Sequence, residues 1–99
     1  MMREEPAMRE VAVQLVRAAG SIAANIAEGY SRGTTADRRK FYEYALGSTR
    51  ECLVWYEAAP PSSLPSSRFD RLVSIRRLLL TMIRNARADS AKLHAPFSK

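Results

Sequence analysis

The sequence predicts a single all-α domain, an up-down antiparallel bundle of three long helices. Three observations lead to this prediction. Apolar residues recur at alternating three- and four-residue steps in three segments, which is the spacing of an amphipathic helix. Stretches rich in glycine or proline, at residues 29–35 and 60–67, separate these segments. The chain of 99 residues is long enough for one domain, 1–99, and its 46% of hydrophobic residues can form a core.

The first helix is predicted over residues 6–27. Pro6 is well tolerated in a first helical turn, and the glycine-containing turn that begins at Gly29 is expected to follow the helix. The segment is rich in alanine, glycine and serine, which allow a neighbouring helix to approach closely. Its predicted core-facing stripe consists of Met8, Val11, Leu15, Ala18, Ile22 and Asn25.

The second helix is predicted over residues 36–58, with Thr34 and Asp37 as a capping box at its start. Gly47 lies in the middle of this helix, where glycine costs about 1 kcal/mol relative to alanine. A glycine in that place indicates close backbone packing. The predicted stripe consists of Phe41, Ala45, Ser48, Cys52, Trp55 and Ala59.

The third helix is predicted over residues 68–91, with Ser67 and Asp70 as its capping pair. Its predicted seam consists of Leu72, Ile75, Leu79, Met82 and Ala86. The tail, residues 93–99, is expected to be frayed.

The positive charge of the chain lies almost entirely in its last segment. From residue 60 onward there are eight basic and two acidic residues, which accounts for the whole net charge of +6. Arg76, Arg77, Arg84 and Arg87 fall within an arc of about 100° on the third helix, away from its seam. Because arginine binds phosphates and carboxylates in a forked geometry, these four residues are predicted to bind nucleic acid or an acidic protein. The alternative is a solvated helix face that only keeps the protein soluble.

No catalytic, cofactor-binding or metal-binding residue is predicted, and no cofactor is expected. His94 is the only histidine and lies near the predicted frayed end. Cys52 lies on the apolar stripe of the second helix, which indicates a buried, inert thiol. Zinc sites need several closely spaced cysteines or histidines, and the glycines at residues 29 and 33 lack the lysine of a phosphate-binding loop.

A cytoplasmic location is expected. The sequence contains no run of about 18 apolar residues and no signal-peptide pattern, so no association with a membrane is predicted. A single cysteine suits a reducing compartment.

Five polar residues are predicted to form a structural network between the first two helices. Ser21, Asn25 and Glu28 share one face of the first helix, and Ser48 and Glu51 share one face of the second. A buried hydrogen-bond network of this kind would determine how the two helices align. The alternative is that the Glu28 and Glu51 carboxylates form a pair for acid–base catalysis.

The same region resembles a known family. Residues 21–29, Ser-Ile-Ala-Ala-Asn-Ile-Ala-Glu-Gly, followed by Phe41 and by Ala-Leu-Gly-Ser at 45–48, resemble the four-helix bundle proteins encoded in bacterial 23S rRNA intervening sequences. The resemblance covers residues 14–59 well. It implies a helical bundle that forms a homo-oligomer, a pentamer among relatives. A related branch, the accessory protein of diversity-generating retroelements, binds a reverse transcriptase and nucleic acid.

Relatives of this kind usually carry a further helix before the region of Gln14. Here only thirteen residues precede Gln14, so the chain is interpreted as a natural short form or as one with a misplaced start. Three helices of a four-helix core would leave an apolar groove, which we expect another subunit to fill.

These observations together predict a non-enzymatic, oligomeric bundle. It would bind nucleic acid or a nucleic-acid enzyme through the arginine face of its third helix. The alternative is a protein–protein interaction or structural module that binds no nucleic acid.

Overall fold

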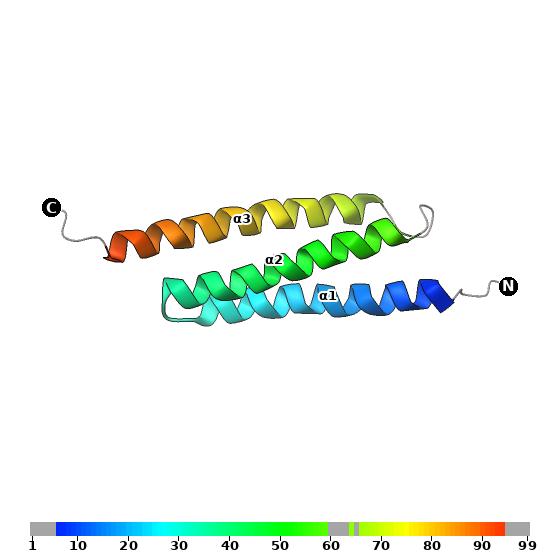
Figure 1. Ribbon diagram of the computed structural model, residues 1–99, viewed down its shortest axis with the longest axis horizontal. Helices are drawn as coiled ribbons and strands as arrows, with labels where there is room; N and C mark the ends of the chain where they lie inside the picture. The colour runs from blue at the N-terminus through cyan, green and yellow to red at the C-terminus, as the bar shows by residue number, and fades with distance from the viewer. Residues whose placement is uncertain (1–5, 60–63, 65, 95–99) are drawn as a thin grey trace.

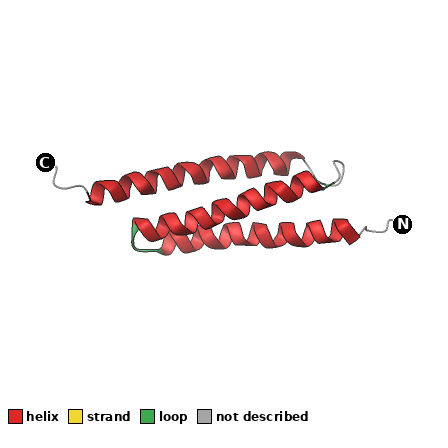
Figure 2. Cartoon of the chain, in the orientation of Figure 1, coloured by secondary structure: helices red, strands yellow, loops and turns green. Residues whose placement is uncertain are grey.

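The chain folds into three helices, seen in a computed structural model that describes residues 6–59, 64 and 66–94, with side chains described as far as Asp89 (Figure 1). Helix α1 spans Pro6–Ser31, α2 spans Thr35–Ala58 and α3 spans Ser66–His94. The described residues contain no strand, so the predicted all-α class is confirmed (Figure 2). None of the described helices has a stretch long and apolar enough to cross a membrane.

Helix α2 lies between the other two, and its backbone is the only one that lies close to the backbones of both. The three helices run up, down and up, with α1 and α3 on either side of α2 (Figure 1). No Cα atom of α1 lies within 8 Å of one in α3. The bundle is therefore held together through α2.

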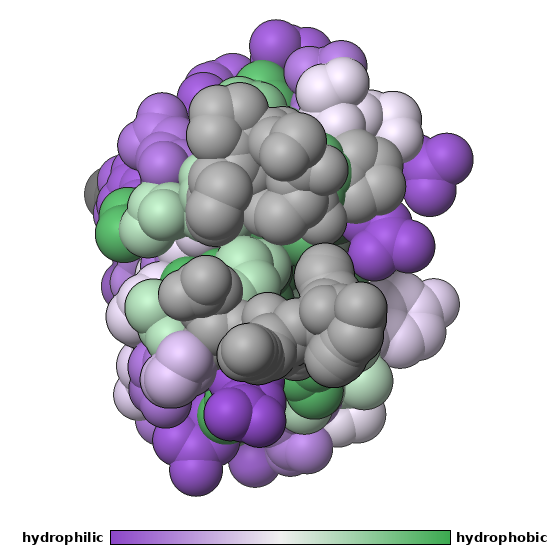
Figure 3. Space-filling model, turned by 90° about the vertical axis from the view of Figure 1, so that its right-hand side faces the viewer, coloured by the Kyte–Doolittle hydropathy of each residue, from purple (hydrophilic) through white to green (hydrophobic). Residues whose placement is uncertain are grey.

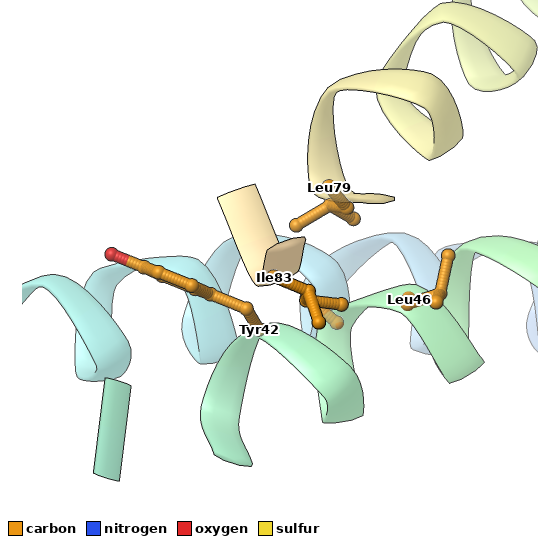
Figure 4. Close-up of a cluster of buried hydrophobic side chains, with 5 residues drawn as sticks. Tyr42, Leu46, Leu79 and Ile83 are labelled. Carbon is orange, nitrogen blue, oxygen red and sulfur yellow. The ribbon is translucent and has the colours of Figure 1, made fainter. Parts of the chain in front are cut away.

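The core consists of two clusters, one on each side of α2. Tyr42, Ala45 and Leu46 of α2 pack against Leu79 and Ile83 of α3 (Figure 4). Because both clusters remove apolar side chains from water, their burial stabilises the two helix pairs.

The second cluster joins α2 to α1, where Ala18 and Ile22 pack against Cys52. Between the two clusters lies Thr49, the one buried polar residue among those described. Its hydroxyl donates a hydrogen bond to the Ala45 carbonyl, 2.8 Å away, so its burial leaves no unpaired donor.

Helix α1 continues four residues past its predicted end, because Gly29 packs inside the helix instead of opening a turn. No described glycine has a positive φ. A Cβ atom placed on Gly29 would lie 2.8 Å from Cε1 of Tyr42 and 3.1 Å from Cβ of Phe41. The absence of a side chain at this position is what allows α2 to lie so close to α1.

The turn between α1 and α2 is therefore short, covering residues 32–34. The predicted cap is present, since Oγ1 of Thr34 accepts a hydrogen bond from the Asp37 amide at 3.1 Å. Helix α3 begins one residue before the predicted cap residue Ser67 and continues to His94. Most of the tail predicted to be frayed, residues 95–99, lies outside the described residues.

Gly47, unlike Gly29, has no neighbouring helix close to it. The sequence predicts close backbone packing at Gly47, but apart from the adjacent residues and the nearby backbone of α2, no atom lies within 4 Å of the position that its Cβ would occupy. The prediction failed because the spacing of Gly47 says nothing about which side of α2 the neighbouring helices cover. Gly47 lies on the exposed side.

Candidate functional site

An apolar groove runs between α1 and α3, with α2 as its floor. Its volume is about 440 Å³. The structure thus contains the apolar groove that was expected for three helices. Arg68 and Arg71 are the charged residues that line it. The other lining residues are Ala12, Leu15, Val16 and Ala19 of α1, Cys52 and Tyr56 of α2, and Leu64, Leu72 and Ile75 around α3.

The exposed side of α1 continues this apolar surface. A helix side that faces only water is normally polar. Among the exposed residues between positions 12 and 27, Arg17 is the only charged one, and Val16 is 73% exposed. In the view onto the end of the bundle where α1 begins, patches of hydrophobic surface show near the centre while the outer rim is mostly hydrophilic (Figure 3). An exposed face of this kind is typical of a contact surface.

Cys52 lies at the floor of the groove as an inert thiol. Its side chain is 1% exposed. Burial raises the pKa of the Cys52 thiol most, and the nearby Glu51 carboxylate raises this pKa further. Because the thiolate is the nucleophilic form, this environment does not suit catalysis by Cys52.

Three of the five predicted network residues are brought together between α1 and α2. The hydroxyls of Ser21 and Ser48 lie 2.8 Å apart. Nδ2 of Asn25 donates to the carbonyl oxygen of Ser21 at 2.8 Å and lies 3.1 Å from its hydroxyl oxygen. This chain of hydrogen bonds connects the two helices and sets their alignment.

The two predicted carboxylates lie outside this network. Oε2 of Glu28 pairs with Arg32 at 2.7 Å, and Glu51 is exposed. Because the helices are antiparallel and Ser21 lies opposite Ser48, Glu28 is level with Phe41, ten residues before Glu51. Ten helical residues correspond to about 15 Å, so the two carboxylates cannot share a proton. The alternative of acid–base catalysis by this pair therefore lacks the necessary geometry.

The predicted arginine face is divided in two by the packing of α3. Arg84 and Arg87 line a second groove of about 500 Å³ between α2 and α3. Arg76 is half-buried and Arg77 is exposed, and neither lines this groove. Helix α2 contributes Glu43 and Arg50 to the same groove. The sequence pattern did not indicate these two residues, because only tertiary packing places them beside Arg84 and Arg87.

A cluster of aromatic and basic side chains covers the turn between α1 and α2. The Arg32 guanidinium lies 4.8 Å from the centre of the Phe41 ring, and Nζ of Lys40 lies 5.5 Å from it. Phe41 also packs edge-to-face against Tyr44, with ring centres 5.6 Å apart. Arg32 thus connects Glu28 of α1 with Phe41 of α2.

The family is decided by a match that covers most of the chain. The model of a family described as 23S rRNA-intervening sequence protein matches residues 2–84. The chain belongs to this family. Comparison with curated proteins and with solved structures finds no match.

In this intervening-sequence protein, Asn25 and Gly29 of the α1 motif lie at the interface with α2, and Glu28 lies on the surface. Asn25 binds Ser21, Glu28 binds Arg32, and Gly29 admits the Tyr42 ring. Among the described residues no three His, Cys, Asp or Glu side chains are grouped so that they could hold a metal ion. Two surfaces of the described residues have a distinct character: the apolar groove with the exposed side of α1, and the basic groove between α2 and α3.

Proposed function

We propose that this protein is a non-enzymatic assembly module: its copies associate through the groove between α1 and α3, and its arginines bind nucleic acid. The observation that supports assembly is the apolar groove of about 440 Å³ beside an exposed side of α1 with a single charge. A reducing compartment, the cytoplasm, suits its buried free thiol.

The occupant that we propose for the groove is a helix of a second copy. The exposed side of α1 is apolar, carries small residues and lies next to the groove, so one contact between two copies would cover both surfaces. A contact between the same surface on both copies closes a dimer, whereas a head-to-tail contact closes a ring. The family resemblance favours a ring of five.

The test of assembly uses two exposed valines as a matched pair. Val16 lines the groove and is 73% exposed, while Val54 lies on α2 away from the groove and is 61% exposed. We expect the wild-type protein to have a native mass that is a multiple of 11.1 kDa. Val16→Glu should shift the mass toward the monomer because a buried carboxylate is unfavourable, and Val54→Glu should leave it unchanged. A wild-type protein that is monomeric at micromolar concentration contradicts the proposal.

Nucleic-acid binding is supported by the net charge of +6 and by the arginines of α3. Each phosphate contact releases counterions, so the affinity should fall steeply between about 50 and 200 mM salt. Changing Arg76, Arg77, Arg84 and Arg87 together to glutamine should remove most of this salt-dependent affinity in a gel-shift assay. An unchanged affinity of that variant contradicts the assignment.

The second candidate is a protein–protein interaction or structural module that binds no nucleic acid. It is favoured by one contact: Nη2 of Arg87 already pairs with Oε2 of Glu43 at 3.1 Å, so part of the arginine face is neutralised within the molecule. This candidate predicts an oligomer without salt-sensitive binding of RNA or DNA. The same gel-shift assay, carried out on the native oligomer, separates the two.

A further inference from the structure

The outward side of α2 carries a line of residues that lies outside both core clusters. Lys40, Tyr44, Gly47 and Arg50 follow one another at steps of four, three and three, so they lie on one face of the helix. Lys40, Gly47 and Arg50 are exposed, and the Tyr44 side chain is 52% exposed. We call these four residues the α2 outer face.

Gly47 leaves bare backbone at the centre of this face. A mid-helix glycine is less stable than alanine by about 1 kcal/mol, and here no close packing compensates for it, because no atom of a neighbouring helix lies within 4 Å of the missing Cβ. A helix without a side chain at one exposed point allows a ligand to approach the backbone closely. Gly47 also lines the basic groove between α2 and α3.

The charge beside Gly47 is positive. Arg50, Arg84 and Arg87 line the groove, and Glu43 is its only acidic lining residue. Oε2 of Glu43 lies 3.1 Å from Nη2 of Arg87 and 3.9 Å from Nε of Arg39. Nε of Arg39 is buried and has no hydrogen-bond partner in the described part of the chain. Two guanidinium groups, those of Arg39 and Arg87, thus share one carboxylate, while Arg50 and Arg84 line the groove as donors for a further anion.

An aromatic ring lies at the other edge of the face. Phe41 packs edge-to-face against Tyr44 and thereby supports its ring from one side. Lys40 adds a cation close to this aromatic pair. An exposed, supported ring next to a basic groove is the combination that binds unpaired bases and their phosphates.

We propose that the α2 outer face and the basic groove bind single-stranded nucleic acid. One base stacks on Tyr44, the backbone crosses α2 at Gly47, and its phosphates bind Arg50 and Arg84. Glu43 opposes this binding, because it carries the like charge of a phosphate and occupies Arg87. The inference rests on the proposed nucleic-acid binding and names its substrate class.

The first test compares single-stranded with paired RNA. The probes are an oligouridylate of roughly 12 nucleotides, within the range of single-strand site sizes, and an RNA duplex of the same length. Tyr44→Ala should weaken binding of the single strand by at least about 5-fold, since stacking on an aromatic side chain contributes about 1–3 kcal/mol per base. The matched control is Tyr30→Ala on α1, which should leave the affinity unchanged. Equal affinities of the wild-type protein for the single strand and the duplex overturn the inference.

The second test enlarges the residue at the centre of the α2 outer face. Gly47→Leu places a side chain where the strand would cross and should weaken binding of the oligouridylate. Ser74→Leu enlarges an exposed residue of α3 that lines neither groove and should not weaken it. Because leucine has a higher helix propensity than glycine or serine, neither change should impair folding, which circular dichroism checks.

The third test predicts tighter binding of the oligouridylate, whereas the first two predict weaker binding. Glu43→Gln removes a negative charge and releases Arg87, so the affinity for the oligouridylate should rise several-fold at about 50 mM salt. A merely structural role for Glu43 would not raise it, and an unchanged or lower affinity overturns the inference.

The outcomes also separate this inference from the proposed function. If the four-glutamine variant of α3 loses binding while Tyr44→Ala and Gly47→Leu bind as the wild type does, the site is elsewhere and nucleic-acid binding stands. If the wild-type protein binds neither probe at low salt, both fail.

Discussion

At the scale of single residues, Gly29 and Gly47 have opposite surroundings although both lie inside helices. Gly29 is in contact with Tyr42 and Phe41 of the neighbouring helix, and Gly47 has open space around it. Their sequence contexts suggested a turn for Gly29 and close packing for Gly47. What decides the role of a helical glycine is the side of the helix to which its missing side chain would point.

We predict that Gly29→Ala destabilises the protein. The added Cβ would lie 2.8 Å from Cε1 of Tyr42, so the ring or the helix must shift. Overpacking of this kind typically costs about 1–3 kcal/mol. The measurement is the free energy of unfolding in urea, with wild type and variant at the same protein concentration.

Gly20→Ala is the control for this prediction. It should stabilise the protein by about 0.5–1 kcal/mol, because no atom lies near the new Cβ and alanine favours the helix. If Gly29→Ala were as stable as Gly20→Ala, the contact with Tyr42 would not limit the approach of α1 and α2.

Cys52 makes the stability of the fold depend on pH. Its pKa is raised from 9.0 in the folded state, first by burial and then by Glu51. The folded protein therefore keeps the proton where the unfolded chain releases it, so this contribution is full below pH 9.0 and is lost as the pH rises through the folded-state pKa.

We accordingly predict that the free energy of unfolding falls more steeply between about pH 8 and pH 10 in the wild type than in Cys52→Ala. Both proteins share all other titrating groups, so the difference between their slopes isolates the thiol. Parallel slopes for the two proteins would mean that the thiol is not desolvated in the folded state.

At the scale of helices, α2 holds the fold together because it alone is buried on two sides. Its buried residues face both neighbours, whereas the backbones of α1 and α3 each lie close to only one helix. The apolar stripes in the sequence predicted the three helices and most of their bounds. They did not predict which part of each stripe is covered, because that depends on where the neighbouring helices lie.

Two consecutive leucines of α3 provide a test at this scale. Leu79 is 1% exposed in the cluster with Tyr42 and Leu46, and Leu78 is 62% exposed. We predict that Leu79→Ala lowers the free energy of unfolding by about 2–5 kcal/mol, the range for a fully buried leucine. Leu78→Ala should change it by less than about 0.5 kcal/mol in the monomer.

If the free energy of unfolding falls more for Leu78→Ala than for Leu79→Ala, α3 is rotated relative to α2. If it falls for Leu78→Ala only at high protein concentration, Leu78 contacts a second copy.

At the scale of the whole molecule, three helices form an incomplete bundle. The backbones of α1 and α3 do not meet, and the apolar groove between them remains open. A chain of 99 residues has a thin stability margin. The open groove leaves apolar side chains in contact with water, although their burial would stabilise the fold. Covering the groove with a second copy would add to that margin.

The corresponding prediction concerns thermal unfolding. If copies associate through the groove, the midpoint of thermal unfolding should rise with protein concentration, because association stabilises the folded state by mass action. Calorimetry over about a hundredfold range of concentration measures this. The midpoint of Val16→Glu should be lower and should not change with concentration.

The sequence by itself determined the features that depend on local spacing: three amphipathic helices, the Thr34 cap, the Cys52 thiol on a core stripe and a basic last segment. Only the tertiary structure decided which residues of the other helices lie beside those features. It placed Ser21 opposite Ser48, separated Glu28 from Glu51, brought Arg50 beside Arg84 and left the groove open. The physical reason is that helical periodicity is set within a few residues, whereas contacts between helices depend on their alignment and on which sides remain uncovered.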